Sequence, residues 1–203
     1  MSITEILVGV TCIISIAAFY NRDIMHRMIF NPYMISERKQ WYRFFSSGFI
    51  HSDWIHLFVN MIVLWSFGQV VEEYYQIVFE EKATFYYLLL YFGGMLISIT
   101  PSYKRNMHNA GYNALGASGA VSSVLFAAIL FQPLQKIYLY GIIGLPGILL
   151  GAAYLVYSYY MNKKGNDNVN HDAHFWGAVF GMLFTVLLKP TLFIYFLDQL
   201  TSF

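Results

Sequence analysis

The chain has 203 residues, of which 58% are hydrophobic and only 11% charged, whereas an average soluble domain has roughly 25% charged residues. This composition is typical of a membrane protein and argues against an ordinary soluble domain. The formal net charge of +1 gives no indication of a nucleic-acid partner, and the single cysteine, Cys12, excludes an intrachain disulfide.

Six apolar stretches are long enough to cross a bilayer, which takes about 17 to 25 residues for a hydrocarbon core of about 30 Å. They lie near residues 3–20, 54–75, 83–100, 114–131, 137–160 and 172–189. Because main-chain polar groups in lipid must be paired within their own segment, each stretch is predicted to be a helix. The sequence therefore predicts an all-α membrane protein of six transmembrane helices that form one domain over residues 1–203.

The first stretch, residues 3–20, is predicted to be retained rather than removed as a signal peptide. A signal peptide carries basic residues before its apolar segment, but the first five residues contain no Lys or Arg, and Arg22 and Arg27 follow the stretch. The connection over residues 21–47 mixes basic residues with Trp and Phe, which is typical of a loop packed at the membrane interface. No separate soluble domain is expected.

Polar residues gather where the second stretch begins, in "HSDWIHLFVNMIVLW". His51 precedes the stretch, and His56 and Asn60 are four residues apart, which puts them on one helical face. Imidazole and amide groups at membrane depth are costly and are usually functional. The entrance of the second span is therefore a candidate site.

Small residues surround a serine where the fourth stretch begins, in "GASG". A lone serine in a membrane helix usually bonds to its own helix. Ser118, however, lies between Gly116 and Gly119, and such small neighbours let a second helix come close enough for a hydroxyl to reach an imidazole. The helix start also leaves unpaired N–H groups, which can stabilise a developing oxyanion.

The sixth stretch begins with "HDAHFWGAVFG", in which Gly177 and Gly181 follow His174. A pair of glycines four apart usually marks close helix packing. With six spans, the second, fourth and sixth enter the membrane from the same side. A nucleophile, a base and oxyanion donors can therefore meet at one depth.

Three separated motifs form one pattern: His51-x4-His56-x3-Asn60-Met61, Gly116-x-Ser118-Gly119, and Ala173-His174-x2-Gly177-x3-Gly181. Together with six spans and a long first loop, this pattern resembles the rhomboid family of intramembrane serine proteases in its bacterial, six-helix form. The resemblance covers essentially the whole chain. It implies a rhomboid-like bundle with a membrane-associated first loop, in a multi-pass protein of the inner cell membrane.

The resemblance also implies the roles of the reacting groups. Ser118 is the expected nucleophile and His174 the general base, in a dyad that has no carboxylate. Asn60 and His56, with the main-chain amides of Ser118 and Gly116, are the expected oxyanion hole. The implied substrate is another membrane protein, cut in or just outside its transmembrane segment, and no cofactor or metal is expected.

Five further residues are expected to support this site rather than react. The resemblance assigns His51 and Arg43 to support of the first loop. The supporting set is completed by Gly119, Gly177 and Gly181. Many relatives carry, four residues after the serine, an aromatic ring that stacks on the imidazole. That position is Ser122 here, which leaves the imidazole to be held by another group.

Three alternatives belong to other classes. A metalloprotease would use the histidines, but H-E-x-x-H does not occur and only His171 and His174 have a spacing suited to a shared metal. A transporter would need charged or broken-helix sites near the membrane midplane, and the charges here lie at helix ends. A catalytically silent protein that binds or escorts membrane helices would be marked by loss of Ser118 or His174.

Two arguments disagree on the side of the membrane that the site faces. The loops on the site's side hold nine Lys or Arg residues and the opposite loops three, which under the positive-inside rule places the site in the cytoplasm. The resemblance implies the opposite, with both termini cytoplasmic. We adopt that orientation, because five of the nine lie in or beside the long first loop.

Overall fold

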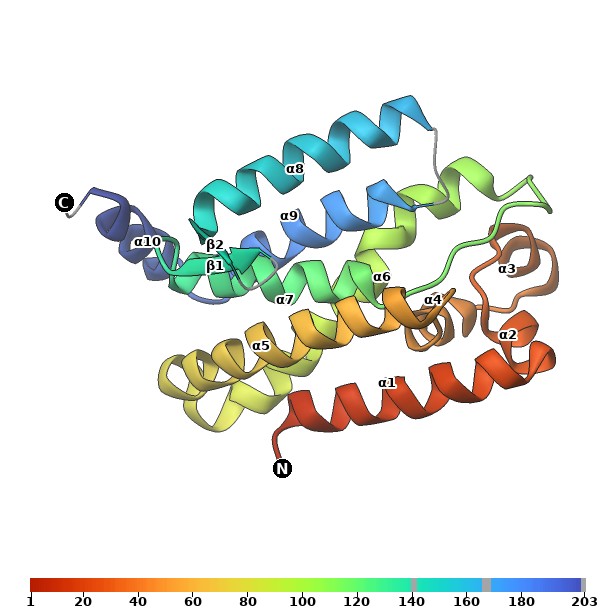
Figure 1. Ribbon diagram of the computed structural model, residues 1–203, viewed down its shortest axis with the longest axis horizontal. Coiled ribbons are helices and arrows are strands. Elements are labelled where there is room, and N and C mark those ends of the chain that lie inside the picture. The colour runs from red at the N-terminus through yellow and green to blue at the C-terminus, as the bar shows by residue number, and fades with distance from the viewer. Residues whose placement is uncertain (140–141, 166–168, 202–203) are drawn as a thin grey trace.

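The computed structural model describes residues 1–139, 142–165 and 169–201 and is a bundle of helices (Figure 1). The six long helices are α1 Ile3–Tyr20, α5 Trp54–Phe79, α6 Ala83–Asn106, α7 Ser118–Phe131, α8 Gly147–Lys164 and α9 His171–Leu188. Shorter helices are α2 Arg22–Met28, α3 Pro32–Arg38, α4 Arg43–Ser46 and α10 Thr191–Thr201, with single 3-10 turns η1 Ser47–Phe49 and η2 Glu80–Lys82. A long helix occupies each of the six predicted stretches.

The number of membrane crossings is a separate question from the number of helices. By length and hydropathy, two described helical stretches could cross a membrane, Ile3–Tyr20 and Trp54–Asn106, or up to three if α9 and α10, bent by 113°, form one span. The second stretch contains the turn η2, beyond which α6 runs back beside α5 (Figure 1). Six crossings therefore stay a prediction.

The predicted helix over 137–160 is wrong at its start. The structure has an antiparallel hairpin there, with β1 Lys136–Leu139 paired to β2 Ile143–Pro146, and α8 begins only at Gly147. Glycine and proline interrupt the apolar run, and its β-branched and aromatic residues favour strands. Positions 140–141 lie outside the described residues.

The predicted helix over 114–131 begins later than expected, at Ser118. Before it the chain is extended: Ala114 forms an isolated β-bridge with Phe30 of the first loop, and Gly116 has a φ of +114°, which favours glycine because it lacks a Cβ. The segment before Ser118 is therefore a strand-like loop rather than a first helical turn.

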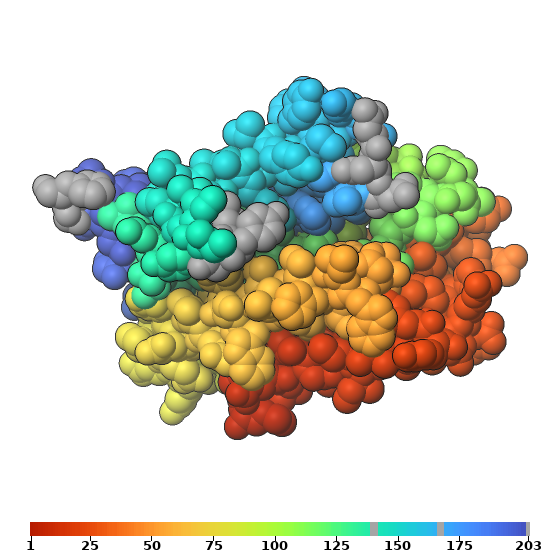
Figure 2. Space-filling model, in the orientation of Figure 1, coloured from red at the N-terminus to blue at the C-terminus, as the bar shows by residue number. Residues whose placement is uncertain are grey.

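Helix α7 is the centre of the bundle, with 12 of its 14 residues buried. It packs against α5, α6 and α9, and the N-terminal ends of α5, α7 and α9 lie toward the same end of the molecule (Figure 1). The outer helices expose large apolar side chains instead, as at Ile13, Ile55 and Val156. Figure 2 shows α5 and α8 forming much of one such outer face, which lipid would solvate.

Candidate active site

Two acceptors from the segment between α4 and α5 hold the chain that leads into Ser118. The Gly116 N–H donates to the Ser47 carbonyl at 2.9 Å, and the Ala117 N–H donates to Nε2 of His51 at 3.3 Å. The Gly116 amide is thus already bonded, which removes it from the oxyanion donors expected from the sequence. Helix α7 begins at Ser118, and the first amides of a helix have no partner within it.

His51 supports this segment through a chain of hydrogen bonds. Because Nε2 accepts from the Ala117 N–H, the neutral ring carries its proton on Nδ1, which lies 2.9 Å from Ser15 Oγ. The Ser15 hydroxyl donates onward to the Phe49 carbonyl at 2.8 Å. His51 is fully buried and therefore links α1, the first loop and the start of α7.

The stability of the protein should fall below neutral pH because His51 must stay neutral. Burial, with a smaller effect from His56, lowers the pKa of His51 to about 3, whereas a histidine in an unfolded chain titrates near 6.5. Stability is then complete above about pH 6.5 and is lost as the pH falls toward 3. At pH 5 the expected loss from this group is about 2 kcal/mol.

Unfolding in detergent at pH 7 and pH 5, compared between the wild type and His51→Gln, measures this loss. The glutamine amide can accept from the Ala117 N–H without titrating, so the variant should lose less stability between the two pH values. An equal loss in both proteins would show that His51 is not responsible.

The start of α5 brings His56 and Asn60 to the same segment. Asp53 caps the helix by accepting from the His56 N–H at 2.8 Å. The hydrogen bond from the Ser52 hydroxyl and, to a smaller extent, this bond from His56 lower the pKa of Asp53. A Cβ placed on Gly116 would lie 2.7 Å from Cε1 of His56, so only glycine fits against this ring. Asn60 is buried and donates one Nδ2 hydrogen to the His56 carbonyl at 2.9 Å.

Helices α7 and α9 touch through their main chains. A Cβ on Gly177 would collide with the carbonyl of Gly119, and one on Gly181 with that of Ser123. The Ser123 hydroxyl lies 2.8 Å from the Gly177 carbonyl and donates across this contact. The main chains of α7 and α9 are therefore in contact at Gly119 with Gly177 and at Ser123 with Gly181.

His174 lies at the fourth position of α9 and is half-buried. Its imidazole stacks on the ring of Tyr154 from α8, with centroids 5.8 Å apart and planes at 16°. The Tyr154 hydroxyl lies 2.8 Å from Ser122 Oγ. Sequence reasoning missed Tyr154, because several tyrosines on α8 could have faced the site.

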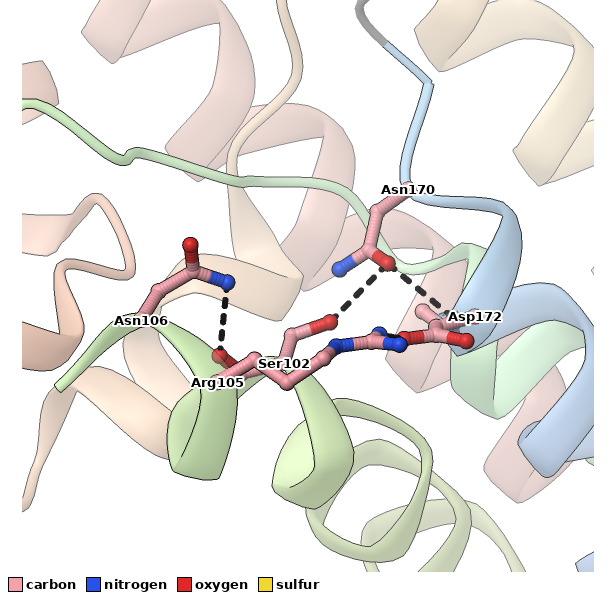
Figure 3. A network of polar contacts seen from close by, with 6 residues as sticks. Ser102, Arg105, Asn106, Asn170 and Asp172 are labelled. Carbon is pink, nitrogen blue, oxygen red and sulfur yellow. Dashed lines mark hydrogen bonds and ion pairs between the residues drawn. The ribbon is translucent and has the colours of Figure 1, made fainter. Parts of the chain in front are cut away.

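A polar network joins the start of α9 to the end of α6 (Figure 3). Asn170 caps α9 by accepting from the Ala173 N–H at 3.2 Å, and the Ser102 hydroxyl donates to the same side-chain oxygen at 3.1 Å. Arg105 forms an ion pair with the buried Asp172. This network was not predicted from the sequence, although an asparagine before a helix is an N-cap signal.

Arg43 joins three parts of the first loop through hydrogen bonds. Its guanidinium donates to the carbonyls of His26 at 3.0 Å and Ile29 at 2.5 Å, and its Nε donates to Gln40 Oε1 at 2.6 Å. The side chain is buried and so fixes the end of α2.

Among the described residues, no three His, Cys, Asp or Glu side chains are grouped as a metal site requires.

Comparison with known proteins finds three rhomboid-like relatives. The chain is 29% identical over 172 residues to "RHOMBOID-like protein 12, mitochondrial" of Arabidopsis thaliana, covering 77% of this chain and 50% of that protein. It is 27% identical over 176 residues to "Rhomboid-like protein 11, chloroplastic" of the same plant, covering 80% and 58%. It is 32% identical over 142 residues to "Presenilin-associated rhomboid-like protein A, mitochondrial" of Danio rerio, covering 67% and 34%.

The chain thus spans about half the length of the two plant relatives and about a third of the length of the Danio rerio relative. A family model for the rhomboid domain matches residues 38–191, a segment that contains every candidate site residue named above except Ser15 and the carbonyls that Arg43 binds. Because this match covers more than half of the chain, the protein is a membrane protein that belongs to the rhomboid family.

Proposed function

We propose that this protein is an intramembrane serine endopeptidase in which Ser118 is the nucleophile and His174 the general base. The observation that carries the proposal is the contact of α7 with α9, where Gly119, next to Ser118, touches Gly177, three residues after His174. Main chains this close allow a hydroxyl on one helix to reach an imidazole on the other.

The reaction follows the acyl-transfer chemistry of serine hydrolases. Ser118 Oγ attacks the peptide carbonyl while His174 takes its proton, and the imidazolium then protonates the leaving amine. Water hydrolyses the acyl-enzyme with His174 again as the base. Ser118 and His174 form a dyad in this proposal, because no carboxylate is given the role of orienting the His174 imidazole.

Three donors stabilise the oxyanion in this proposal. Asn60 Nδ2 carries a second hydrogen beyond the one that it donates to the His56 carbonyl. The ring of His56 borders Gly116, just before the nucleophile. The Ser118 amide, as the first of α7, supplies a main-chain donor.

The length of α7 supports a site within the membrane. A helix of 14 residues is roughly 21 Å long, whereas the hydrocarbon core is about 30 Å thick. If α1, α5, α6, α7, α8 and α9 are the six crossings and Phe131 reaches one surface, Ser118 lies roughly 9 Å below the other. The extended segment before Ser118 leads the chain to that depth.

The proposed substrates are other membrane proteins, cut in or beside a transmembrane segment. Two of the relatives are named mitochondrial and one chloroplastic. The inner cell membrane expected from the sequence gains no support from them, so the proposal extends only to a cellular membrane.

Purified protein in liposomes, incubated with a model transmembrane substrate and compared with Ser118→Ala, tests the proposal. The wild type should release two fragments whose new termini, read by mass spectrometry, fall in or next to the transmembrane segment. Substrate that binds to the wild type and stays intact would favour the alternative of a silent, helix-binding protein.

Asn60→Ala should slow turnover strongly and leave substrate affinity almost unchanged. Loss of one oxyanion donor commonly costs about 10² to 10³ in turnover. The matched control is Asn106→Ala, because Asn106 bonds back to the Ser102 carbonyl of its own helix at 2.9 Å, as Asn60 does to His56. Separate measurement of kcat and KM decides: a defect confined to KM would remove Asn60 from the oxyanion hole.

A further inference from the structure

We propose that Tyr154 is a positioning residue that holds the His174 imidazole for proton transfer, and that Ser122 holds Tyr154. The inference rests on the proposed function, since it concerns the base of the same reaction. Its observation is a bridge: the Tyr154 ring stacks on His174, and its hydroxyl lies 2.8 Å from Ser122 Oγ.

Ser122 ties this bridge to the helix of the nucleophile. It lies four residues after Ser118, so both occupy one face of α7. Its hydroxyl is buried and in a dry interior needs a partner, which Tyr154 supplies. Tyr154 therefore contacts the helix of Ser118 with its hydroxyl and His174 with its ring.

Two further contacts fix the position of the Tyr154 side chain. Gly151, one turn earlier on α8, lets this helix approach α7, since a Cβ there would lie 3.0 Å from Cδ1 of Ile129. The ring of Phe126 lies 6.0 Å from that of Tyr154. A ring held in this way restricts the rotation of the imidazole that it covers, and base catalysis depends on that orientation.

A neighbouring tyrosine on the same helix provides a matched comparison. Tyr157 lies three residues after Tyr154, but its ring meets His171 edge-on, with centroids 5.6 Å apart and planes at 81°. His171 in turn meets His174 edge-on at 5.8 Å. Only Tyr154 of these two tyrosines stacks on the proposed base, so their substitutions should differ in effect.

The kinetic test uses Tyr154→Ala, Tyr154→Phe, Ser122→Ala and the control Tyr157→Ala in liposomes. Tyr154→Ala should lower kcat by roughly 10- to 100-fold with KM nearly unchanged, because a displaced base loses its geometry. Tyr154→Phe keeps the ring and Ser122→Ala frees the hydroxyl, so both should lose only about two- to fivefold. Tyr157→Ala should stay within about twofold of the wild type.

Exchange of the two partners gives a rescue experiment. In the double variant Ser122→Tyr with Tyr154→Ala, a ring from α7 enters the space that the Tyr154 ring left, and kcat should rise above that of Tyr154→Ala. Equal kcat losses for Tyr154→Ala and Tyr157→Ala, or a loss confined to KM, would overturn the inference.

A second readout separates this inference from the proposed function. The imidazole signal of His174 in a carbon-proton correlation spectrum, assigned by its loss in His174→Ala, should be displaced by the ring current of Tyr154. The displacement should persist in Tyr154→Phe and vanish in Tyr154→Ala, whether or not the protein cleaves. An unchanged signal in Tyr154→Ala overturns the inference by removing the contact itself. An inactive wild type whose His174 signal is displaced overturns the proposed function, and with it the role in proton transfer, but leaves the contact of Tyr154 with His174.

Discussion

Ser118→Ala should abolish both substrate cleavage and covalent labelling by a fluorophosphonate. Loss of the nucleophile in a serine hydrolase lowers turnover by at least about 10³-fold, because no remaining group forms the acyl-enzyme. Ser118 is half-buried at the first position of α7, so its hydroxyl can be reached by a small reagent. Labelling followed by peptide mass spectrometry should identify Ser118 in the wild type.

Ser158→Ala is the matched control for this experiment. Ser158 is a fully buried serine on α8, and in the described part of the chain its hydroxyl has no hydrogen-bond partner. Its replacement removes a buried polar atom without breaking a bond and should leave labelling intact. Equal labelling of Ser118→Ala and the wild type would refute the assignment of the nucleophile.

The helical parts of the fold could be predicted because, in lipid, an apolar segment pairs its main-chain N–H and C=O groups by forming a helix. Residues 3–20, for example, form α1 with the predicted bounds. The hairpin before α8 could not be predicted in this way, since a short apolar run fits a strand and a helix equally well. The pairing depends on contacts between β1 and β2, and the pattern of apolar residues along the sequence does not show these contacts.

The sequence motifs name candidate site residues, which stay predictions, but they do not indicate the groups that surround these residues. His51 was expected to support the first loop, yet its partners Ser15 and Ala117 come from two distant segments that only the folded chain brings together. Ser15 in turn donates to the Phe49 carbonyl. The sequence likewise did not show that the Gly116 N–H, an expected oxyanion donor, is bonded to the Ser47 carbonyl, because Ser47 lies far away in the first loop.

Tyr154 shows the same limit on another helix. Helix α8 carries apolar and aromatic residues on most of its surface, so the sequence does not indicate which side faces the bundle. The structure shows buried glycines at 147 and 151 on the inner side, and this sets the rotation that turns Tyr154 toward His174. In the sequence of α8, only the small residues could have indicated which side of the helix faces the bundle.

His174→Ala should abolish cleavage, whereas His171→Ala should retain it. The two histidines are three residues apart on one face of α9, with rings 5.8 Å apart, so proximity alone does not separate them. His174 is half-buried and lies on Tyr154, which bonds to the helix of Ser118. His171 is buried at the first position of α9, next to Tyr157.

The expected losses therefore differ in kind as well as in size. Removal of the base should cost at least about 10³-fold in kcat, as for other serine hydrolases, with the unfolding temperature nearly unchanged because His174 is half-buried. Removal of His171 empties a buried position and should lower the unfolding temperature, while kcat falls by less than about tenfold. Cleavage rates and thermal unfolding of the two variants in the same detergent measure both effects. If His171→Ala is inactive and His174→Ala cleaves, the base is His171, and the contact of α7 with α9 then needs another explanation.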